Sequence, residues 1–271
     1  MERAPDTPLL AFERLDVDYG AAPALRGVDL ALEEGEALGI VGESGSGKST
    51  LLKAAMGLLG PRGRVAGGRV LLRGRNLAEM SAAELRGLRG SQIAMVWQDC
   101  LAHLTPTIRV GDQLYESVAA HEERTRAEVD ARACRLLASL NVAEPERILA
   151  SRPFELSGGL GQRVGVAMAM ITRPALLLAD EPTSALDTVS QKQVAEELAA
   201  LCREEGTALL LVSHNVAVVR ALAGRVAVMR EGRIVEQGPT EQVLAHPRHA
   251  YTRELVEAVP RLPWEEMEAE R

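Results

Sequence analysis

Apolar segments of strand length alternate with segments of helix-forming residues along most of the chain. The segments 37–41, 175–179 and 208–212 are almost continuously apolar, which is typical of parallel strands that are covered on both faces. Segments rich in helix formers follow two of them, at 49–59 and 189–203. The alternation predicts an α/β fold around a parallel sheet.

The remaining segments extend this pattern. Further strands are expected at 9–17, 28–32, 68–72, 92–97, 225–229 and 233–236, and a further helix at 157–171. Between about 98 and 153 the chain becomes helical and charged, which predicts an inserted helical subdomain. After residue 240 we expect short helices and an acidic tail.

The charge balance argues against a nucleic-acid partner. The 271 residues include 31 lysines and arginines against 38 aspartates and glutamates, so the net charge is −7, whereas nucleic-acid-binding domains carry a basic surplus. Neither a signal peptide nor an apolar run of the ~18 residues that a membrane span needs is expected. Cys100, Cys134 and Cys202 are too scattered for a disulfide framework or a zinc site.

A glycine-rich loop between a strand and a helix carries the strongest chemical signal. Its residues, which match the pattern GxxxxGK[ST], are Gly42, Glu43, Ser44, Gly45, Ser46, Gly47, Lys48, Ser49 and Thr50. In such a loop the main-chain N–H groups point toward the phosphates of a nucleotide. Lys48 would reach the β- and γ-phosphates, and the Ser49 hydroxyl would bind Mg²⁺. The alternative is a merely glycine-rich turn, but the flanking strand and helix favour a phosphate site.

An acidic pair follows the apolar segment 175–179. Asp180 and Glu181 come at the carboxyl end of this expected strand, the edge at which parallel sheets bind ligands. There Asp180 would hold Mg²⁺ through water, and Glu181 would activate water for attack on the γ-phosphate. The alternative is that both carboxylates only cap the next helix.

A third motif precedes the expected helix at 157–171. Ser157 is a good helix N-cap, and Ser157, Gly158 and Gly159 form a nest that offers free N–H donors to an anion. The motif is weak alone, and its spacing from the other two strengthens it.

Together these motifs resemble the nucleotide-binding subunit of ATP-binding cassette (ABC) transporters. The sequence LSGG at 156–159 resembles the signature of that family, Gln98 its Q-loop glutamine, and His214 its switch histidine. Ser184-Ala185-Leu186-Asp187 resembles the D-loop, and Tyr19 resembles the aromatic residue that stacks on adenine.

The resemblance, over about 9–260, implies a fold. This is the P-loop NTPase fold of ABC ATPases, α/β, with a parallel-sheet core, an antiparallel β subdomain and an inserted α-helical subdomain at about 98–160. The ATPase domain would span 1–260, and a short C-terminal extension would cover 240–271.

The resemblance also implies the ligands and their contacts. The implied cofactors are ATP and Mg²⁺. The implied catalytic residues are Glu181, His214 and Gln98. The implied magnesium ligands are Ser49, Gln98 and Asp180. Three of the residues that carry the resemblance also have an interpretation without a role at the site: Tyr19 as an ordinary tyrosine at a strand end, Gln98 as a turn residue and His214 as a helix cap.

The implied partners are protein subunits. In the family two ATPase subunits meet head to tail, so that the phosphate loop of one faces LSGG of the other. The second subunit would be a paralogue or a second copy, joined by two membrane permeases and an extracytoplasmic binding protein, with no nucleic acid. The chain would lie at the cytoplasmic face of the cell (inner) membrane as a peripheral subunit.

Four positions depart from the family pattern. The family usually has a longer polar residue or a methionine where Leu160 stands, and a basic or other polar residue near Gly161. Asn215 replaces an aspartate, and Cys100 replaces a proline. None of them removes a phosphate, metal or catalytic group.

A more specific resemblance indicates the class of transported substrate. The stretch GPTEQVLAHPRHAYTRELVEAVP at 238–260 resembles the peptide/nickel importer group, which implies uptake of dipeptides, oligopeptides, nickel or metal–chelator complexes. The alternatives are a non-transport ABC ATPase, of the cofactor-assembly or DNA-repair type, and a non-hydrolysing cassette. The presence of Lys48, Asp180, Glu181 and His214 disfavours the last.

Overall fold

The computed structural model describes residues 7–183 and 188–258. Its strands are β1 (Leu10–Tyr19), β2 (Ala22–Leu32), β3 (Ala37–Val41), β4 (Gly63–Leu72), β5 (Arg75–Asn76), β6 (Ile93–Val96), β7 (Leu176–Asp180), β8 (Ala208–Ser213), β9 (Arg225–Arg230) and β10 (Arg233–Pro239). Its α-helices are α1 (Lys48–Ala55), α2 (Ala82–Leu88), α3 (Val110–Ala119), α4 (Arg126–Ser139), α5 (Pro145–Ala150), α6 (Gly158–Met170), α7 (Thr188–Glu205), α8 (Val216–Leu222), α9 (Thr240–Ala245) and α10 (Ala250–Glu257).

The larger sheet forms the centre of the molecule. Its strand order is β10-β9-β3-β8-β7-β6, with β9, β3, β8, β7 and β6 parallel and β10 antiparallel to β9. The register aligns Val41 with Ser213 and Asp180 with Val212, so β3, β7 and β8 end at one edge. The expected parallel-sheet core is confirmed, and this edge gathers the loops that carry the chemistry.

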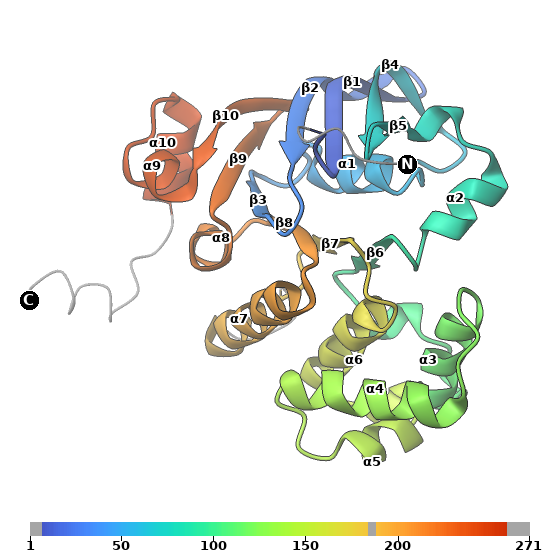
Figure 1. Cartoon of the computed structure of the whole chain (residues 1–271). Coiled ribbons are helices and arrows are strands. Elements are labelled where there is room, and N and C mark those ends of the chain that lie inside the picture. Colours follow the sequence, from blue (N-terminus) through green and yellow to red (C-terminus); the bar gives the residue numbers. More distant parts are fainter. Residues whose placement is uncertain (1–6, 184–187, 259–271) are drawn as a thin grey trace, which may run out of the picture.

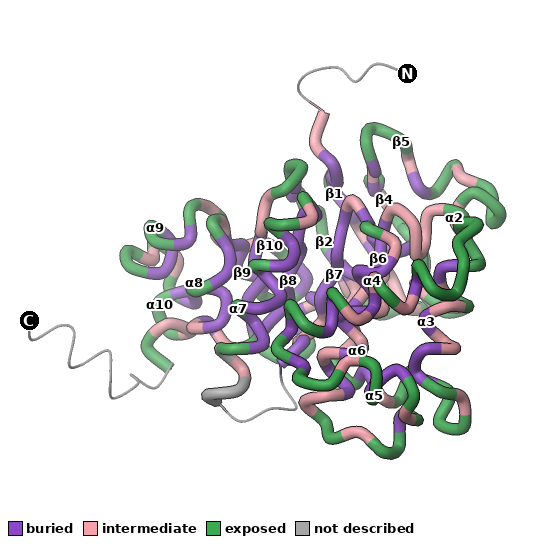
Figure 2. The backbone as a smooth tube through the Cα atoms, turned by 60° about the horizontal axis from the view of Figure 1, so that its bottom comes forward, coloured by how far each residue is buried: buried purple, intermediate pink, exposed green. Residues whose placement is uncertain are grey.

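The smaller sheet is antiparallel in the order β2-β1-β4-β5 and lies above the larger sheet in Figure 1. Leu176 and Leu178 of β7 belong to the core shared with this sheet and α1, whereas Leu177 and Ala179 belong to the core beneath the larger sheet. This alternation is the period of two of a strand. Both faces of the larger sheet are therefore covered, which explains its purple strands in Figure 2 and the apolar sequence of β7.

Helix α1 is shorter than expected. The expected helix covered 49–59, but α1 ends at Ala55. Gly57 adopts a left-handed conformation with φ of 62°, and its N–H donates to the Ala54 carbonyl. A glycine in this conformation is a common helix end.

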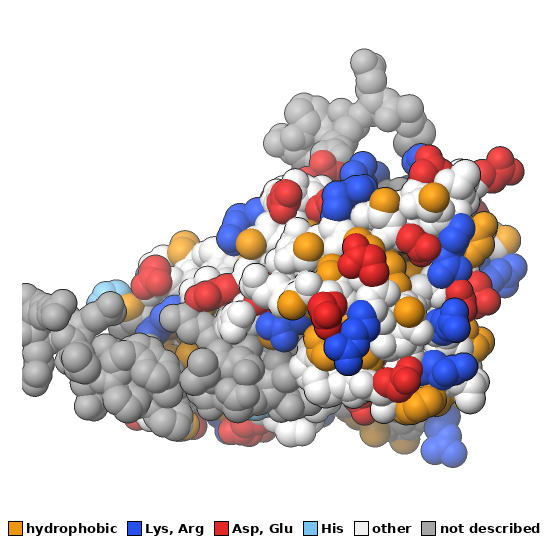
Figure 3. Space-filling model, turned by 90° about the horizontal axis from the view of Figure 1, so that it is seen from below, with side chains coloured by type: hydrophobic (Ala, Val, Ile, Leu, Met, Phe, Trp, Pro, Cys, Tyr) orange, Lys and Arg blue, Asp and Glu red, His pale blue; other side chains and the backbone are white. Residues whose placement is uncertain are grey.

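Helices α3, α4 and α5 lie between β6 and α6 along the chain and pack on one another at the lower end of Figure 1. Helix α4 begins with a capping box between Thr125 and Glu128, and Arg126 pairs with both Asp112 and Asp130. The face seen from this end in Figure 3 carries acidic and basic side chains intermixed.

A buried ion pair joins this helical region to the core. Arg163 of α6 and Glu197 of α7 have side chains only 16% and 7% exposed, with Nε and Oε2 3.2 Å apart. Asn141 and Gln193 also donate to the Glu197 carboxylate, at 2.6 and 2.9 Å, and Arg163 Nε donates to the Leu140 carbonyl at 2.7 Å. One carboxylate thus connects the end of α4 with α6 and α7.

Within 7–183 and 188–258, no helix combines the length and the apolar character needed to cross a lipid bilayer.

Candidate functional site: a phosphate-binding cleft

The loop from β3 to α1 is shaped by two glycines that no larger residue could replace. A Cβ on Gly42 would lie 2.1 Å from the Met229 carbonyl oxygen, and one on Gly47 would lie 2.9 Å from the Ala24 carbonyl oxygen. Gly47 has a φ of 108° and precedes the first residue of α1. The loop therefore curls against its neighbours and delivers Lys48 at the helix N-terminus, where a positive potential favours anions.

Lys48 is held against its own loop. Its side chain is buried and donates from Nζ to the carbonyls of Gly42 and Glu43, at 2.7 and 2.8 Å. Burial lowers the pKa of Lys48, and the carboxylates of Glu181, Asp180 and Glu43 oppose this shift. The ammonium group thus lies among carbonyls that phosphate oxygens could replace.

One hydroxyl of the loop is buried without a hydrogen-bond partner among the described residues. Ser46 is 5% exposed, and its Oγ has no hydrogen-bond partner among the residues that the structure describes. Buried polar groups almost always have a partner. Ser46 does not line the cleft beside the loop, so this hydroxyl belongs to the internal packing of the loop.

The acidic pair meets the loop at its helix end. Ser49 Oγ donates to Asp180 Oδ1 at 3.1 Å, and burial raises the pKa of Asp180, against the lowering effect of that hydrogen bond. Oxygen atoms of hydroxyl and carboxylate groups are the ligands that Mg²⁺ prefers. In proteins Mg²⁺ is usually bound by one or two carboxylates together with phosphate and water. Ser49 and Asp180 therefore fit this ion.

Glu181 and His214 form a pair at the neighbouring strand ends. His214 Nδ1 lies 2.8 Å from Glu181 Oε2, with side chains 60% and 20% exposed. Glu181 has a φ of 48°, a strained conformation for a residue other than glycine, and its N–H donates to the Val212 carbonyl. Asn215, one of the departures, caps α8 through the Ala217 N–H.

Several of these residues line one cleft of about 480 Å³, whereas His214 is not part of its lining. It brings together residues of the loop with Gln98, Asp180 and Glu181; the full lining is Pro23, Ala24, Arg26, Ser44, Gly45, Gly47, Lys48, Ser49, Thr50, Gln98, Asp180, Glu181, Glu231 and Gly232. No sequence pattern indicated that Arg26 or the β9–β10 turn at Glu231 and Gly232 would line the cleft. The Arg26 N–H donates to the Gly232 carbonyl at 2.8 Å, a contact between segments far apart along the chain.

Two expected sites lie apart from this cleft. Tyr19 ends β1 half-buried, and its ring lies against Gly63; adenine stacking stays a prediction. Ser157 caps α6 by accepting from the Leu160 N–H at 3.4 Å, as expected, and is exposed. The D-loop residues 184–187 lie outside the described residues.

Two departures from the family pattern, Gly161 and Cys100, lie in the same contact between α6 and the segment after β6. A Cβ on Gly161 would lie 2.3 Å from Leu101, and a Cβ on Gly165 would lie 2.2 Å from the Cys100 sulfur. Helix α6 therefore packs closely on the segment that follows β6. Gly161 and Cys100 take part in this packing rather than in phosphate chemistry.

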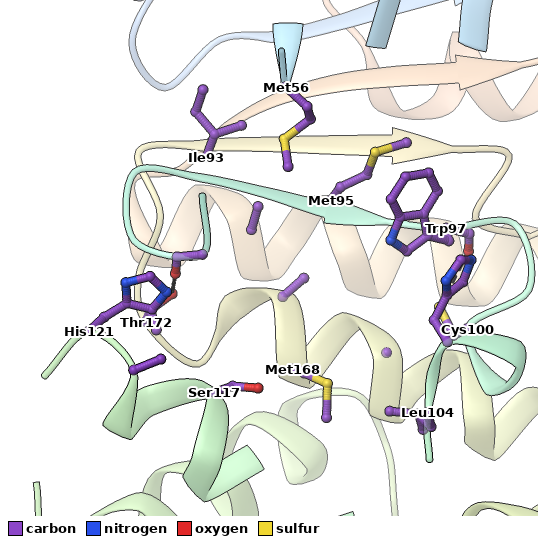
Figure 4. A pocket seen from close by; sticks show the side chains of 16 residues that line it. Met56, Ile93, Met95, Trp97, Cys100, Leu104, Ser117, His121, Met168 and Thr172 are labelled. Atoms are coloured by element: carbon purple, nitrogen blue, oxygen red, sulfur yellow. Dashed lines mark hydrogen bonds between the residues drawn. The ribbon is translucent and has the colours of Figure 1, made fainter. Parts of the chain in front are cut away.

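A second, apolar cleft of about 360 Å³ lies between β6 and helices α3 and α6 (Figure 4). Met56, Met95 and Met168 line it, and Trp97 faces it (Figure 4). Trp97 is half-buried and stacks on His103, with ring centroids 4.9 Å apart. It follows the last residue of β6, where the chain leaves the sheet for the Gln98 segment.

Comparisons with known proteins agree with this geometry. The model of the ABC transporter family matches residues 25–184. The model of the oligopeptide/dipeptide transporter C-terminal region matches residues 235–271. The second match overlaps the stretch 238–260 that carried the resemblance to the peptide importers.

Curated relatives and solved structures carry related names. The dipeptide transport ATP-binding protein DppD of Bacillus subtilis is 38% identical over 94% of this chain and 77% of its own length. The glutathione import ATP-binding protein GsiA of Escherichia coli O157:H7 is 41% identical over 94% of this chain, which spans only 42% of that protein. The dimeric structure of an ATP-binding cassette in a post-hydrolysis state, bound to ADP and phosphate, has a TM-score of 0.74 and 27% identity, covering 85% of this chain and 98% of that one.

Three observations indicate the same family: the phosphate loop beside an acidic strand end, the match over 25–184, and the similarity to DppD. The chain belongs to the ATPase subunits of ABC transporters and carries the C-terminal region of the oligopeptide and dipeptide transporters.

Proposed function

We propose that the chain binds Mg-ATP in the cleft around Lys48 and hydrolyses it to drive uptake of small peptides through partner permeases. The observation that carries this proposal is the convergence of the loop, Gln98, Asp180 and Glu181 on one cleft. Such a cleft offers an anion site and a general base side by side, as phosphoryl transfer to water requires.

Each residue has a role that its position supports. Lys48 exchanges the carbonyls of Gly42 and Glu43 for β- and γ-phosphate oxygens. Ser49, Asp180 and Gln98 would hold Mg²⁺, which neutralises charge on the phosphates when it is bound. Glu181 accepts a proton from the attacking water, and His214, whose Nδ1 lies within hydrogen-bond distance of the Glu181 carboxylate, orients that carboxylate.

A second ATPase subunit would complete the site. Ser157 and Gly158 are exposed and Gly159 is half-buried at the start of α6, away from the cleft of their own chain. Their N–H groups are free to bind the phosphates held by the loop of a partner. The dimeric cassette bound to ADP and phosphate supports this arrangement, with a paralogue or a second copy as the partner.

The methionine-lined cleft of Figure 4 suits an apolar segment of a permease. Methionines adapt to partners of different shape, and Trp97 links this cleft to Gln98, its neighbour in sequence. The γ-phosphate would thus influence the permease contact through one short segment. The chain would lie on the cytoplasmic face of the membrane as a peripheral subunit.

Small peptides are the favoured cargo. The relatives above are named for dipeptide and glutathione import, and the match at 235–271 is to a peptide transporter region. These names favour peptides over nickel or a metal–chelator complex. Delivery would require an extracytoplasmic binding protein.

The test is the Glu181→Gln variant of the full chain, assayed for Mg-ATP binding and for phosphate release with its permeases. We expect turnover to fall at least ~100-fold, because the amide cannot accept the proton, while the Kd for Mg-ATP changes less than about twofold. Glu241→Gln, an exposed carboxylate on α9, serves as the matched control and should behave as the wild type.

Two results would count against the proposal. Undiminished hydrolysis in Glu181→Gln would remove that residue from its role. Hydrolysis unaffected by permeases, in a chain that does not co-purify with them, would instead support a non-transport ATPase.

A further inference from the structure

The C-terminal region contacts the phosphate loop directly. The backbone N–H of Glu43 donates to the Tyr251 hydroxyl at 2.9 Å, across 208 positions of sequence. Tyr251 belongs to α10 and is 2% exposed. A helix of the oligopeptide/dipeptide region thus reaches the first peptide of the loop.

This contact acts on the same peptide unit as Lys48. The peptide that joins Gly42 to Glu43 accepts from Lys48 Nζ through the Gly42 carbonyl and donates to Tyr251 through the Glu43 N–H. Gly42 also packs tightly on the Met229 carbonyl. When Lys48 turns to the phosphates it gives up the Gly42 carbonyl, and the Tyr251 hydroxyl still fixes the orientation of the peptide.

The position of Tyr251 is itself determined by neighbouring groups. The Arg230 guanidinium lies over its ring, 4.7 Å from the centroid. Glu236 of β10 accepts from the N–H groups of Arg248 and His249 through its two carboxylate oxygens, at 2.9 and 3.1 Å. His249 Nδ1 in turn accepts from the Tyr251 N–H at 3.2 Å. These contacts fix the start of α10, and with it the hydroxyl.

We propose that Tyr251 is a positioning residue for the phosphate-binding loop, through which the C-terminal region sets the affinity for ATP. This inference rests on the proposed nucleotide binding. Tyr251 holds the loop from outside the cleft; it does not line the cleft and takes no part in hydrolysis.

The test is Tyr251→Phe in the full chain, which removes the hydroxyl and keeps the ring over which Arg230 lies. We expect the Kd and the KM for Mg-ATP to rise about fivefold, as for one lost hydrogen bond, with kcat within twofold of the wild type. Hydrogen exchange at the Glu43 amide should accelerate, because its acceptor is gone. Tyr115→Phe is the matched control, since Arg126 lies over that ring too, 5.6 Å from its centroid on α3.

A second variant reaches the loop only through α10. Glu236→Gln leaves one oxygen for two N–H donors and should raise the Kd about twofold. The effect should not add to that of Tyr251→Phe, because both act through the same hydrogen bond.

The outcomes are distinguishable. Wild-type affinity in Tyr251→Phe, an equal loss in Tyr115→Phe, or a fall in kcat as large as the rise in KM would overturn the inference and leave ATP binding intact. Failure of the wild-type chain to bind Mg-ATP would instead overturn the proposed function on which the inference rests.

Discussion

The buried Arg163–Glu197 pair gives the sharpest stability prediction. In Glu197→Gln one amide oxygen would face the donors of Arg163, Asn141 and Gln193, which now share a carboxylate. Breaking a buried ion pair by removing one partner costs about 3–5 kcal/mol. We take about 3 kcal/mol, because the Arg163 side chain keeps 16% exposure and its bond to the Leu140 carbonyl.

This free energy corresponds to a measurable shift in melting temperature. At about 2.1 cal/mol/K per residue, a chain of this size has an unfolding entropy near ~0.6 kcal/mol/K. The expected fall in Tm is therefore about 5 °C, measured by calorimetry without nucleotide. Glu204→Gln, an exposed carboxylate on the same helix, should shift Tm by less than about 1 °C.

A double variant checks the mechanism. Arg163→Met combined with Glu197→Leu removes both charges and fills the site with apolar groups, which is often neutral or stabilising. It should recover most of the lost Tm. A Tm unchanged in Glu197→Gln, or a double variant less stable than either single one, would refute the reasoning.

Two further predictions concern the thiols and the apolar cleft. Burial raises the pKa of Cys100 to about 11 and that of Cys202 to about 12, and it raises the pKa of Cys134 as well. The three thiols therefore differ mainly in exposure, and half-exposed Cys134 should be alkylated first at pH 8, as mass spectrometry of iodoacetamide-treated protein would reveal. Rapid labelling of Cys202 in folded protein would contradict this. Met168→Glu places a charge in the methionine-lined cleft and should reduce co-purification with permeases at least ~10-fold without changing the Kd for Mg-ATP. Met80→Glu, outside that cleft, should leave co-purification unchanged. Normal co-purification of Met168→Glu would show that the permease does not dock in this cleft.

The parts of the fold that local sequence determines were predictable. Strands β3, β7 and β8 are apolar because both faces are buried, and the loop after β3 needs glycines where a Cβ would strike Met229 or Ala24. The expected phosphate loop and acidic pair therefore lie together at one edge of the sheet.

The contacts that were missed join segments distant in sequence. Nothing local in Tyr251 indicates that its hydroxyl meets Glu43, and the turn at Glu231 and Gly232 enters the cleft only through sheet pairing. The close approach of Cys100 to Gly165 is likewise a property of the folded pair. Such contacts depend on tertiary packing, which periodicity does not encode.

The attachment of Lys48 to its own loop has a consequence for ligand choice. The Lys48 ammonium already has two carbonyl acceptors, at 2.7 and 2.8 Å. The free energy gained by an incoming anion is therefore only the difference between its contacts with Lys48 and the two hydrogen bonds that are lost. In the proposed binding mode Lys48 contacts the β- and γ-phosphates, so a nucleoside monophosphate would gain little from the exchange. A longer polyphosphate tail would offset the two lost hydrogen bonds with ionic contacts to Lys48. The folded-back side chain would therefore favour nucleotides with longer phosphate tails.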